Sequence, residues 1–218
     1  MSIDEKENDL PRPPSKDDVL IRPERSAWQM NACLNHAQNS DYGYRHGYRR
    51  AAFILAEWVN INGVDQDSLV FPIFHSYRHH VELMLKRLIE TGCNLLGRGL
   101  TTHEMGLLKR HRLDKLWEAF GPILNEVSKS SHMEPPPKQE LEGVESYIKQ
   151  ITDVDPESFS FRYSTSQVGA QSVPDVTHLN LLVFANYMER LCDYLDGIDG
   201  FFMYYKDSLD EIYSAGEY

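Results

Sequence analysis

The segment from residue 67 to residue 96 constrains the fold more than any other part of the sequence. Apolar residues recur in it at a spacing of three or four, at Ile73, Tyr77, Val81, Leu85 and Leu88. Such a stripe covers one face of an α-helix and has to be buried against other elements. Pro72 falls in the first turns of this segment, where a proline is tolerated. The pattern therefore predicts a long helix at the centre of a packed domain.

Helical periodicity continues through most of the remaining chain. We predict further helices at about 26–34, 42–60, 111–128, from the prolines at 135–137 to 151, and 177–215, the last with a break at Gly197 or Gly200. The glycine-containing stretch after residue 92 is predicted as a connector, and the periodicity changes near residues 153–176, as in a short hairpin or an extended loop. The fold class expected is all-α, a single-domain helical bundle at 25–218 after a flexible, proline-bearing lead-in at 1–24.

Composition limits where the protein works and what it binds. The three cysteines form no CxxC pair, and the N-terminus lacks an apolar signal region, which favours a cytoplasmic location without membrane contact. The net charge of −11 disfavours broad nucleic-acid binding. The charge is uneven, however, because residues 77–117 carry eight Lys and Arg against four Asp and Glu.

The predicted central helix carries a row of charges beside its apolar stripe. Arg78, Glu82 and Lys86 are four residues apart, so they are neighbours on one helical face. They form either a surface ladder of ion pairs or a polar cluster with a function. His111, which begins a later helix, is a candidate partner for this cluster or a histidine held by packing alone.

Three short motifs together resemble the HEPN superfamily of small helical domains, and also a group of bacterial helical proteins that share all three. The motifs are Tyr77-Arg78-x-x-x-Glu82-Leu-x-Leu-Lys86, then His111-x-Leu-x-x-Leu116, then Asp155-Pro-x-Ser-Phe-x-Phe-Arg162-Tyr163. The resemblance extends over most of residues 40–200. It implies a helical bundle that forms homodimers and acts on, or responds to, RNA or nucleotides, in a bacterial defence or toxin setting.

Many HEPN proteins are ribonucleases that need no metal and use an Arg-x(4–6)-His motif. In that chemistry the histidine transfers protons and the arginine stabilises the charge that develops on phosphate. The literal match here is Arg98 to His103, in the glycine-containing connector. The resemblance thus implies a candidate catalytic set of Arg78, Glu82, His111, Arg98 and His103, and a substrate-binding set of Arg162, Tyr77 and Tyr163.

No cofactor or metal is predicted. The sequence contains neither a phosphate-loop nor a dinucleotide fingerprint. His75, His79 and Glu82 fall on one helical face, which is compatible with metal ligation, but no second helix offers an obvious set of ligands.

Two main hypotheses of function remain open at this point, beside a third possibility, the binding of a small molecule in an apolar pocket between helices with one or two of these polar groups at its rim. In the first, the protein is a metal-independent ribonuclease, which requires Arg78, His111 and Arg162 to meet in one open cleft. In the second, it is a non-catalytic protein-interaction or dimerisation module, in which Arg78, Glu82 and His111 form a buried network that links helices. The aromatic and basic residues near 42–50 allow a similar choice between a single-strand binding surface and a helix with one packed face.

Overall fold

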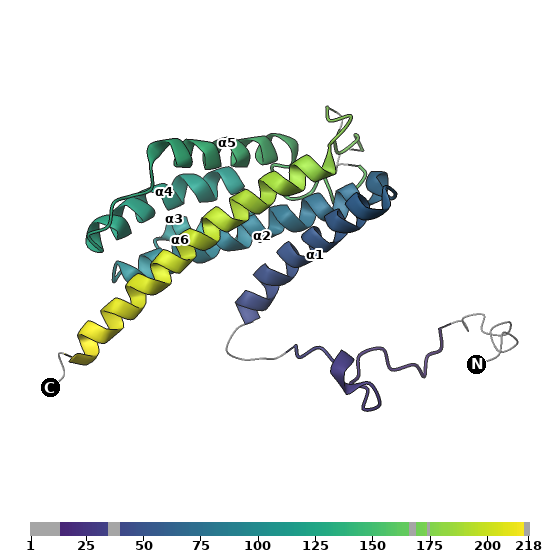
Figure 1. The fold of residues 1–218 in the computed structure, drawn as a ribbon, viewed down its shortest axis with the longest axis horizontal. Helices are drawn as coiled ribbons and strands as arrows, with labels where there is room; N and C mark the ends of the chain where they lie inside the picture. Colours follow the sequence, from purple (N-terminus) through teal and green to yellow (C-terminus); the bar gives the residue numbers. More distant parts are fainter. Residues whose placement is uncertain (1–13, 35–39, 166–168, 174, 216–218) are drawn as a thin grey trace, which may run out of the picture. The chain divides into compact units, whose positions relative to one another are not determined.

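The computed structural model describes residues 14–34, 40–165, 169–173 and 175–215, and in this part of the chain it is helical (Figure 1). Within these ranges, six α-helices follow a short 3-10 turn at Trp28–Met30: α1 (Ser40–Asn62), α2 (Gln66–Leu95), α3 (Thr102–Leu108), α4 (Leu113–Ser130), α5 (Lys138–Val154) and α6 (Leu181–Ala215). The described residues include no strand beyond a single antiparallel bridge between Thr165 and Gln171. The predicted all-α class is confirmed.

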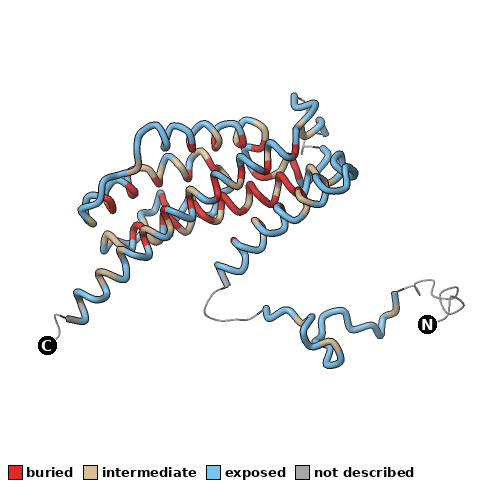
Figure 2. Tube along the Cα trace, viewed as in Figure 1, coloured by how far each residue is buried: buried red, intermediate tan, exposed pale blue. Residues whose placement is uncertain are grey.

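Helix α2 is the centre of the bundle. It packs against α4 and α6, and α4 in turn packs against α5 and the short α3. Figure 2 shows the buried segments of α2, α4 and α6 facing one another in the middle of the bundle. The apolar stripe predicted from sequence is the reason, because Ile73, Tyr77, Val81, Leu85 and Leu88 are all fully buried.

The close approach of α2, α4 and α6 depends on Gly92. A Cβ atom at this position would lie 2.4 Å from Cγ2 of Ile123 on α4 and 3.1 Å from the ring of Phe202 on α6. No larger residue fits there without moving one of the neighbouring helices.

Helix α1 is attached to the bundle differently. Its packing face offers two small buried side chains, Ala52 and Ala56, and two arginines. Arg45 pairs with Asp41 at 2.9 Å and reaches the sulfur of Met84 on α2. Arg49 pairs with three carboxylates on α6, those of Glu189, Asp193 and Asp196. These polar contacts add to the packing of the partly buried Leu55 and Val59 against the core.

The structure differs from the predicted elements in three places. Helix α3 was not predicted, although Thr101 and Glu104 form a complete capping box at its start. Helix α6 runs without the predicted break, because Gly197 and Gly200 face solvent while Ile198 and Phe202 beside them stay buried. The predicted helix at 26–34 was wrong, since only the turn Trp28–Met30 forms.

Among the described N-terminal residues, 14–34, no apolar side chain is buried that could support a longer helix. Its exposed apolar residues include Leu20, Ile21, Trp28 and Met30, and an isolated helix of nine residues is marginal in water. The chain divides into two compact units, residues 1–40 and residues 41–218. The single helical domain at 25–218 stays a prediction. The predicted lead-in at 1–24 falls partly outside the described residues.

No helix among the described residues is both long enough and apolar enough to cross a lipid bilayer.

Candidate functional site: the Arg78 network

Arg78 lies at the centre of a buried polar cluster formed with Glu82, Asp155, His111 and Lys86, which we call the Arg78 network. The Arg78 side chain is 1% exposed. Its Nη1 donates to Glu82 at 3.0 Å, and its Nε donates to the backbone oxygen of Asp155 at 3.1 Å and lies 3.2 Å from the Asp155 carboxylate. Its Nη2 donates to the backbone oxygen of His111 at 2.6 Å. All three nitrogens of the guanidinium are therefore engaged inside the protein.

Glu82 joins α2 to the start of α4. One carboxylate oxygen accepts from Arg78, and the other accepts from Lys86 at 2.8 Å and contacts Nδ1 of His111 at 2.8 Å. Burial alone would raise the pKa of the Glu82 carboxyl, but the hydrogen bonds and charges of Lys86 and His111 outweigh it and lower that pKa. Glu82 is therefore a charged carboxylate in a fully paired buried site.

Asp155 joins the end of α5 to the loop that follows it. Its side chain is 1% exposed, and Oδ1 accepts the backbone N–H groups of Phe159 at 2.7 Å and Ser160 at 2.9 Å. The same residue holds Arg78 through its backbone oxygen. The Arg78 network thus fixes α2, the start of α4, the end of α5 and the following turn relative to one another.

His111 is the member of the network with the most exposed side chain. Its ring is 48% exposed, while Nδ1 is held by Glu82. Its backbone oxygen, not its ring, accepts from Arg78. An external ligand can therefore reach the imidazole of His111 but not the guanidinium of Arg78.

Arg98 and His103 lie together at a separate cleft, in the segment of the chain between Lys86 and His111. Arg98 makes two hydrogen bonds to Glu104, at 3.0 and 2.9 Å, and this pairing helps to lower the pKa of Glu104 to about 2. His103 is exposed on α3. Glu104, Glu118 and Glu126 all line the same cleft. Three carboxylates beside a neutralised arginine oppose the binding of phosphate.

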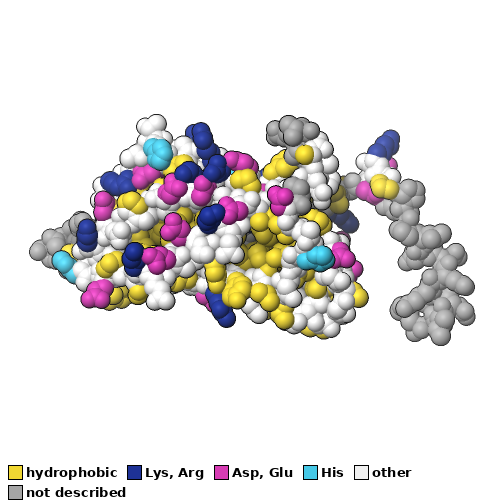
Figure 3. Space-filling view, turned by 90° about the horizontal axis from the view of Figure 1, so that it is seen from above, with side chains coloured by type: hydrophobic (Ala, Val, Ile, Leu, Met, Phe, Trp, Pro, Cys, Tyr) yellow, Lys and Arg dark blue, Asp and Glu magenta, His cyan; other side chains and the backbone are white. Residues whose placement is uncertain are grey.

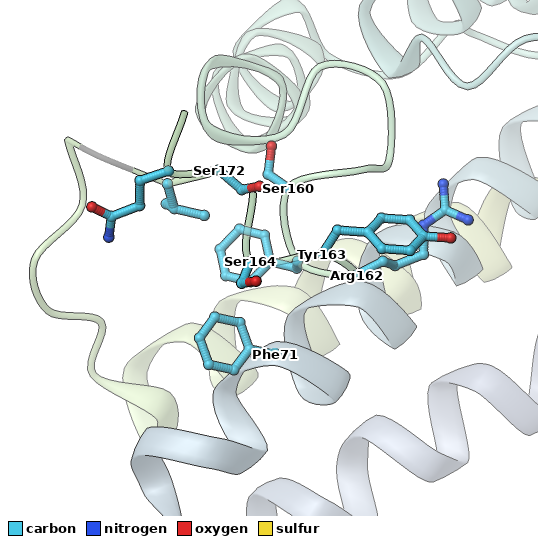
Figure 4. Close-up of a pocket in the computed structure, with 9 residues that line it drawn as sticks. Phe71, Ser160, Arg162, Tyr163, Ser164 and Ser172 are labelled. Atoms are coloured by element: carbon cyan, nitrogen blue, oxygen red, sulfur yellow. The ribbon is translucent and has the colours of Figure 1, made fainter. Parts of the chain in front are cut away.

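Arg162 and Tyr163 extend together to one side of the loop, away from Phe71 and Ser164 (Figure 4). They line a cleft of about 390 Å³ that also includes serine side chains. Nε of Arg162 donates to the backbone oxygen of Ser158 at 2.5 Å, and its guanidinium lies 5.7 Å from the Tyr163 ring centroid. Arg162 therefore makes these contacts within its own loop, where they stabilise the loop conformation.

Phe161, between these residues in chain order, anchors the loop to the bundle. It is buried and stacks on Phe74 of α2 at 3.7 Å, and Phe74 stacks in turn on Phe184 of α6 at 5.0 Å. Together with the contacts of Asp155, this stacking accounts for the Asp-Pro-x-Ser-Phe-x-Phe motif as a device that closes one end of the bundle.

Tyr77, His75 and His79 of α2 do not form a substrate-binding or metal-binding site in this structure. Tyr77 is fully buried, so a substrate cannot reach it. His75 and His79 stack ring on ring at 5.8 Å, and burial lowers the pKa of His79 to about 4. Glu82 is turned toward the Arg78 network, and among the described residues no three His, Cys, Asp or Glu side chains are grouped as metal ligands.

A further cleft of about 450 Å³ lies between α5 and α6. It is mainly apolar and is lined by none of the predicted site residues. On the face seen in Figure 3, charged side chains of both signs are interspersed over one half and hydrophobic side chains gather over the other. A mainly apolar cleft of this kind can hold an apolar side chain or a small apolar ligand, and Gln150 and the two tyrosines Tyr147 and Tyr187 supply its polar groups.

Sequence reasoning did not identify Asp155 as a partner of Arg78, although it singled out the motif that begins there. The available signal was an Asp-Pro pair at the end of a predicted helix. Aspartate at such a position commonly accepts backbone N–H groups of the next turn.

The chain was compared with family models, curated proteins and solved structures, and a functional proposal has to rest on the geometry described above. No family model, no curated protein and no solved structure matches this chain.

Proposed function

We propose that this chain is a HEPN-like, non-catalytic interaction module that associates with a second copy of itself. The observation that carries the proposal is the burial of Arg78. A phosphate-binding arginine needs free N–H groups at a surface, whereas Arg78 is 1% exposed and donates to Glu82, Asp155 and His111.

The pair Arg98 and His103 supports the non-catalytic proposal independently of Arg78. The guanidinium of Arg98 donates two hydrogen bonds to the Glu104 carboxylate. The cleft that Arg98 shares with His103 is lined by carboxylates. The charges of Arg78 and Arg98 are thus both neutralised within the protein. The Arg78 network then serves to hold the helices in one arrangement, which is what a binding surface requires.

The test is incubation of purified protein with a mixed RNA pool in excess EDTA. We expect the RNA to remain intact with the wild type, His111→Ala and His103→Ala alike. His178→Ala, at an exposed position before α6, is the matched control for loss of a histidine. Cleavage that survives EDTA and disappears in His111→Ala or His103→Ala alone would overturn the non-catalytic proposal.

One observation favours the second candidate, a metal-independent ribonuclease of a bacterial defence or toxin system. The imidazole of His111 is half exposed and is oriented through Nδ1 by a buried carboxylate, an arrangement suited to proton transfer. Such a ribonuclease would have to supply a phosphate-binding cation other than Arg78, so the proposal ranks second.

A further inference from the structure

The outward face of α1 carries a regular apolar stripe. Its positions alternate between spacings of three and four, and we call them the α1 seam: Tyr44, Gly47, Ala51, Ile54, Trp58 and Ile61. This is the spacing of the core positions in a two-helix coiled coil. The large side chains are exposed by 65% for Tyr44, 50% for Ile54, 50% for Trp58 and 75% for Ile61. The seam extends over about 26 Å of helix.

The α1 seam has no packing role inside the helical unit. Helix α1 faces the bundle through Arg45, Arg49, Ala52 and Ala56, on its other side. A Cβ atom added at Gly47 would meet no atom within 4 Å. Exposed Ile and Trp residues in a continuous line are costly in water unless they are covered by a partner.

We propose that the α1 seam binds the α1 seam of a second copy of this chain, with the two helices antiparallel. The sizes of the side chains fit this register. Gly47 would face Trp58 of the second copy, and Ala51 would face Ile54. Tyr44 would face Ile61 at each end. Each small residue provides the space that a large residue needs, as interdigitating packing requires.

The charges beside the α1 seam fit the same register. Arg50 and Glu57 both lie on one flank of the seam, seven residues apart, and neither makes an ion pair with another described residue. In the antiparallel register Arg50 of one copy meets Glu57 of the other, and the two-fold axis produces this pair twice. A parallel pairing would place Arg50 opposite Leu55 and leave the charges unpaired.

The contacts on the inner side of α1 prepare the seam for binding. The three carboxylates around Arg49 and the hydrogen bond of His80 to the backbone oxygen of Arg45 fix the rotation of α1 on the bundle. Because the helix is held before the second copy arrives, little conformational entropy is lost on association. This inference rests on the proposed function and names its partner and its surface.

The experiment is sedimentation velocity on the full chain, with the wild type, Arg50→Glu, Glu57→Arg and the double variant. Each single reversal places like charges together at two symmetric points, so we expect the dissociation constant to rise at least about tenfold. The double variant restores both pairs, and its dissociation constant should return to within about threefold of the wild type. Arg110→Glu, at an exposed position outside α1, controls for the change in net charge, and far-UV circular dichroism confirms folding.

The possible failures are distinct. A dimer that none of the α1 variants weakens would overturn the α1 seam and leave the proposed function standing. Weakening by both single variants without recovery in the double variant would overturn the antiparallel register. A wild-type chain that stays monomeric at every concentration would overturn both the seam and the proposed self-association, including the case in which residues 1–40 cover the seam within one molecule.

Discussion

Helices α1 and α2 use similar residues in opposite ways. Both contain arginines, aromatic residues and carboxylates at helical spacing. In α2 the charged side chains of Arg78 and Glu82 are sealed in the bundle. In α1 two of the arginines, Arg45 and Arg49, contact the bundle, and the apolar Ile54 and Trp58 face solvent. A buried charge with every partner inside the protein maintains structure, whereas a stripe of exposed apolar side chains is a surface available for binding.

The largest expected effect comes from Arg78→Met, which keeps the length of the side chain and removes its charge. Glu82 and Asp155 would lose a buried partner, and loss of one member of such a cluster costs about 3–5 kcal/mol in the free energy of unfolding. Urea denaturation measures this loss. The matched control is Lys149→Met, which breaks the exposed pair with Asp153 and should cost less than about 0.5 kcal/mol. Equal losses in the two variants would show that the Arg78 network does not hold the fold.

The next effect tests the packing of α2 independently of charge. We expect Gly92→Ala to lower the free energy of unfolding by about 1–3 kcal/mol, because its Cβ would collide with Ile123. Gly197→Ala is the control, since a Cβ there meets no atom within 4 Å and should stabilise α6 by about 0.5–1 kcal/mol. A neutral Gly92→Ala variant would contradict the close packing of α2, α4 and α6.

A smaller change in the free energy of unfolding is expected from the titration of His79 as the pH falls. The pKa of His79 is about 4 in the folded chain against an ordinary value of 6.5, so between these values the unfolded chain binds a proton that the folded chain does not. Stability is therefore complete above pH 6.5 and decreases as the pH falls toward 4. His79→Phe keeps a ring beside Tyr48 and removes the titrating group. Between pH 7 and pH 5 the wild type should lose about 1 kcal/mol more than this variant. Equal losses would exclude His79 as the source.

The smallest effect on stability, and a large one on association, is expected for Trp58→Ala. Trp58 is half exposed, so its removal should change the free energy of unfolding of the monomer by less than about 1 kcal/mol. The dissociation constant of the dimer should rise at least about tenfold, as for a central aromatic residue in an interface. Trp28→Ala, in the N-terminal unit, should change neither quantity. A Trp58→Ala variant that unfolds readily and dimerises normally would reverse the assignment of α1.

The fold was largely predictable from sequence because helical periodicity is a local property. The apolar stripe of α2 predicted its buried face correctly, and α1, α4 and α5 began and ended near the expected residues. The failures arose where local signals were weak or were outweighed by packing. Gly197 and Gly200 looked like a break in α6, but the buried residues on either side keep that helix continuous.

The candidate site was less predictable, since burial of a charge depends on distant segments. The spacing of Arg78 and Glu82 indicated an interaction between them, but not that the backbone of residues 155–156 and of His111 would take up the rest of the guanidinium. The Arg98 to His103 spacing matched a ribonuclease motif, whereas the nearby Glu104 forms a capping box and pairs with the arginine. The spacing between two residues does not reveal which third residue binds one of them in the folded chain.

We propose that this chain acts by association with a second copy of itself, and sedimentation equilibrium of the wild type is the direct test of that association. The monomer has a mass of 25.2 kDa. We predict that the weight-average mass rises reversibly with concentration and approaches twice this value in the micromolar range, which is common for interfaces of moderate size. A mass that stays at that of the monomer across the whole range would contradict the claim.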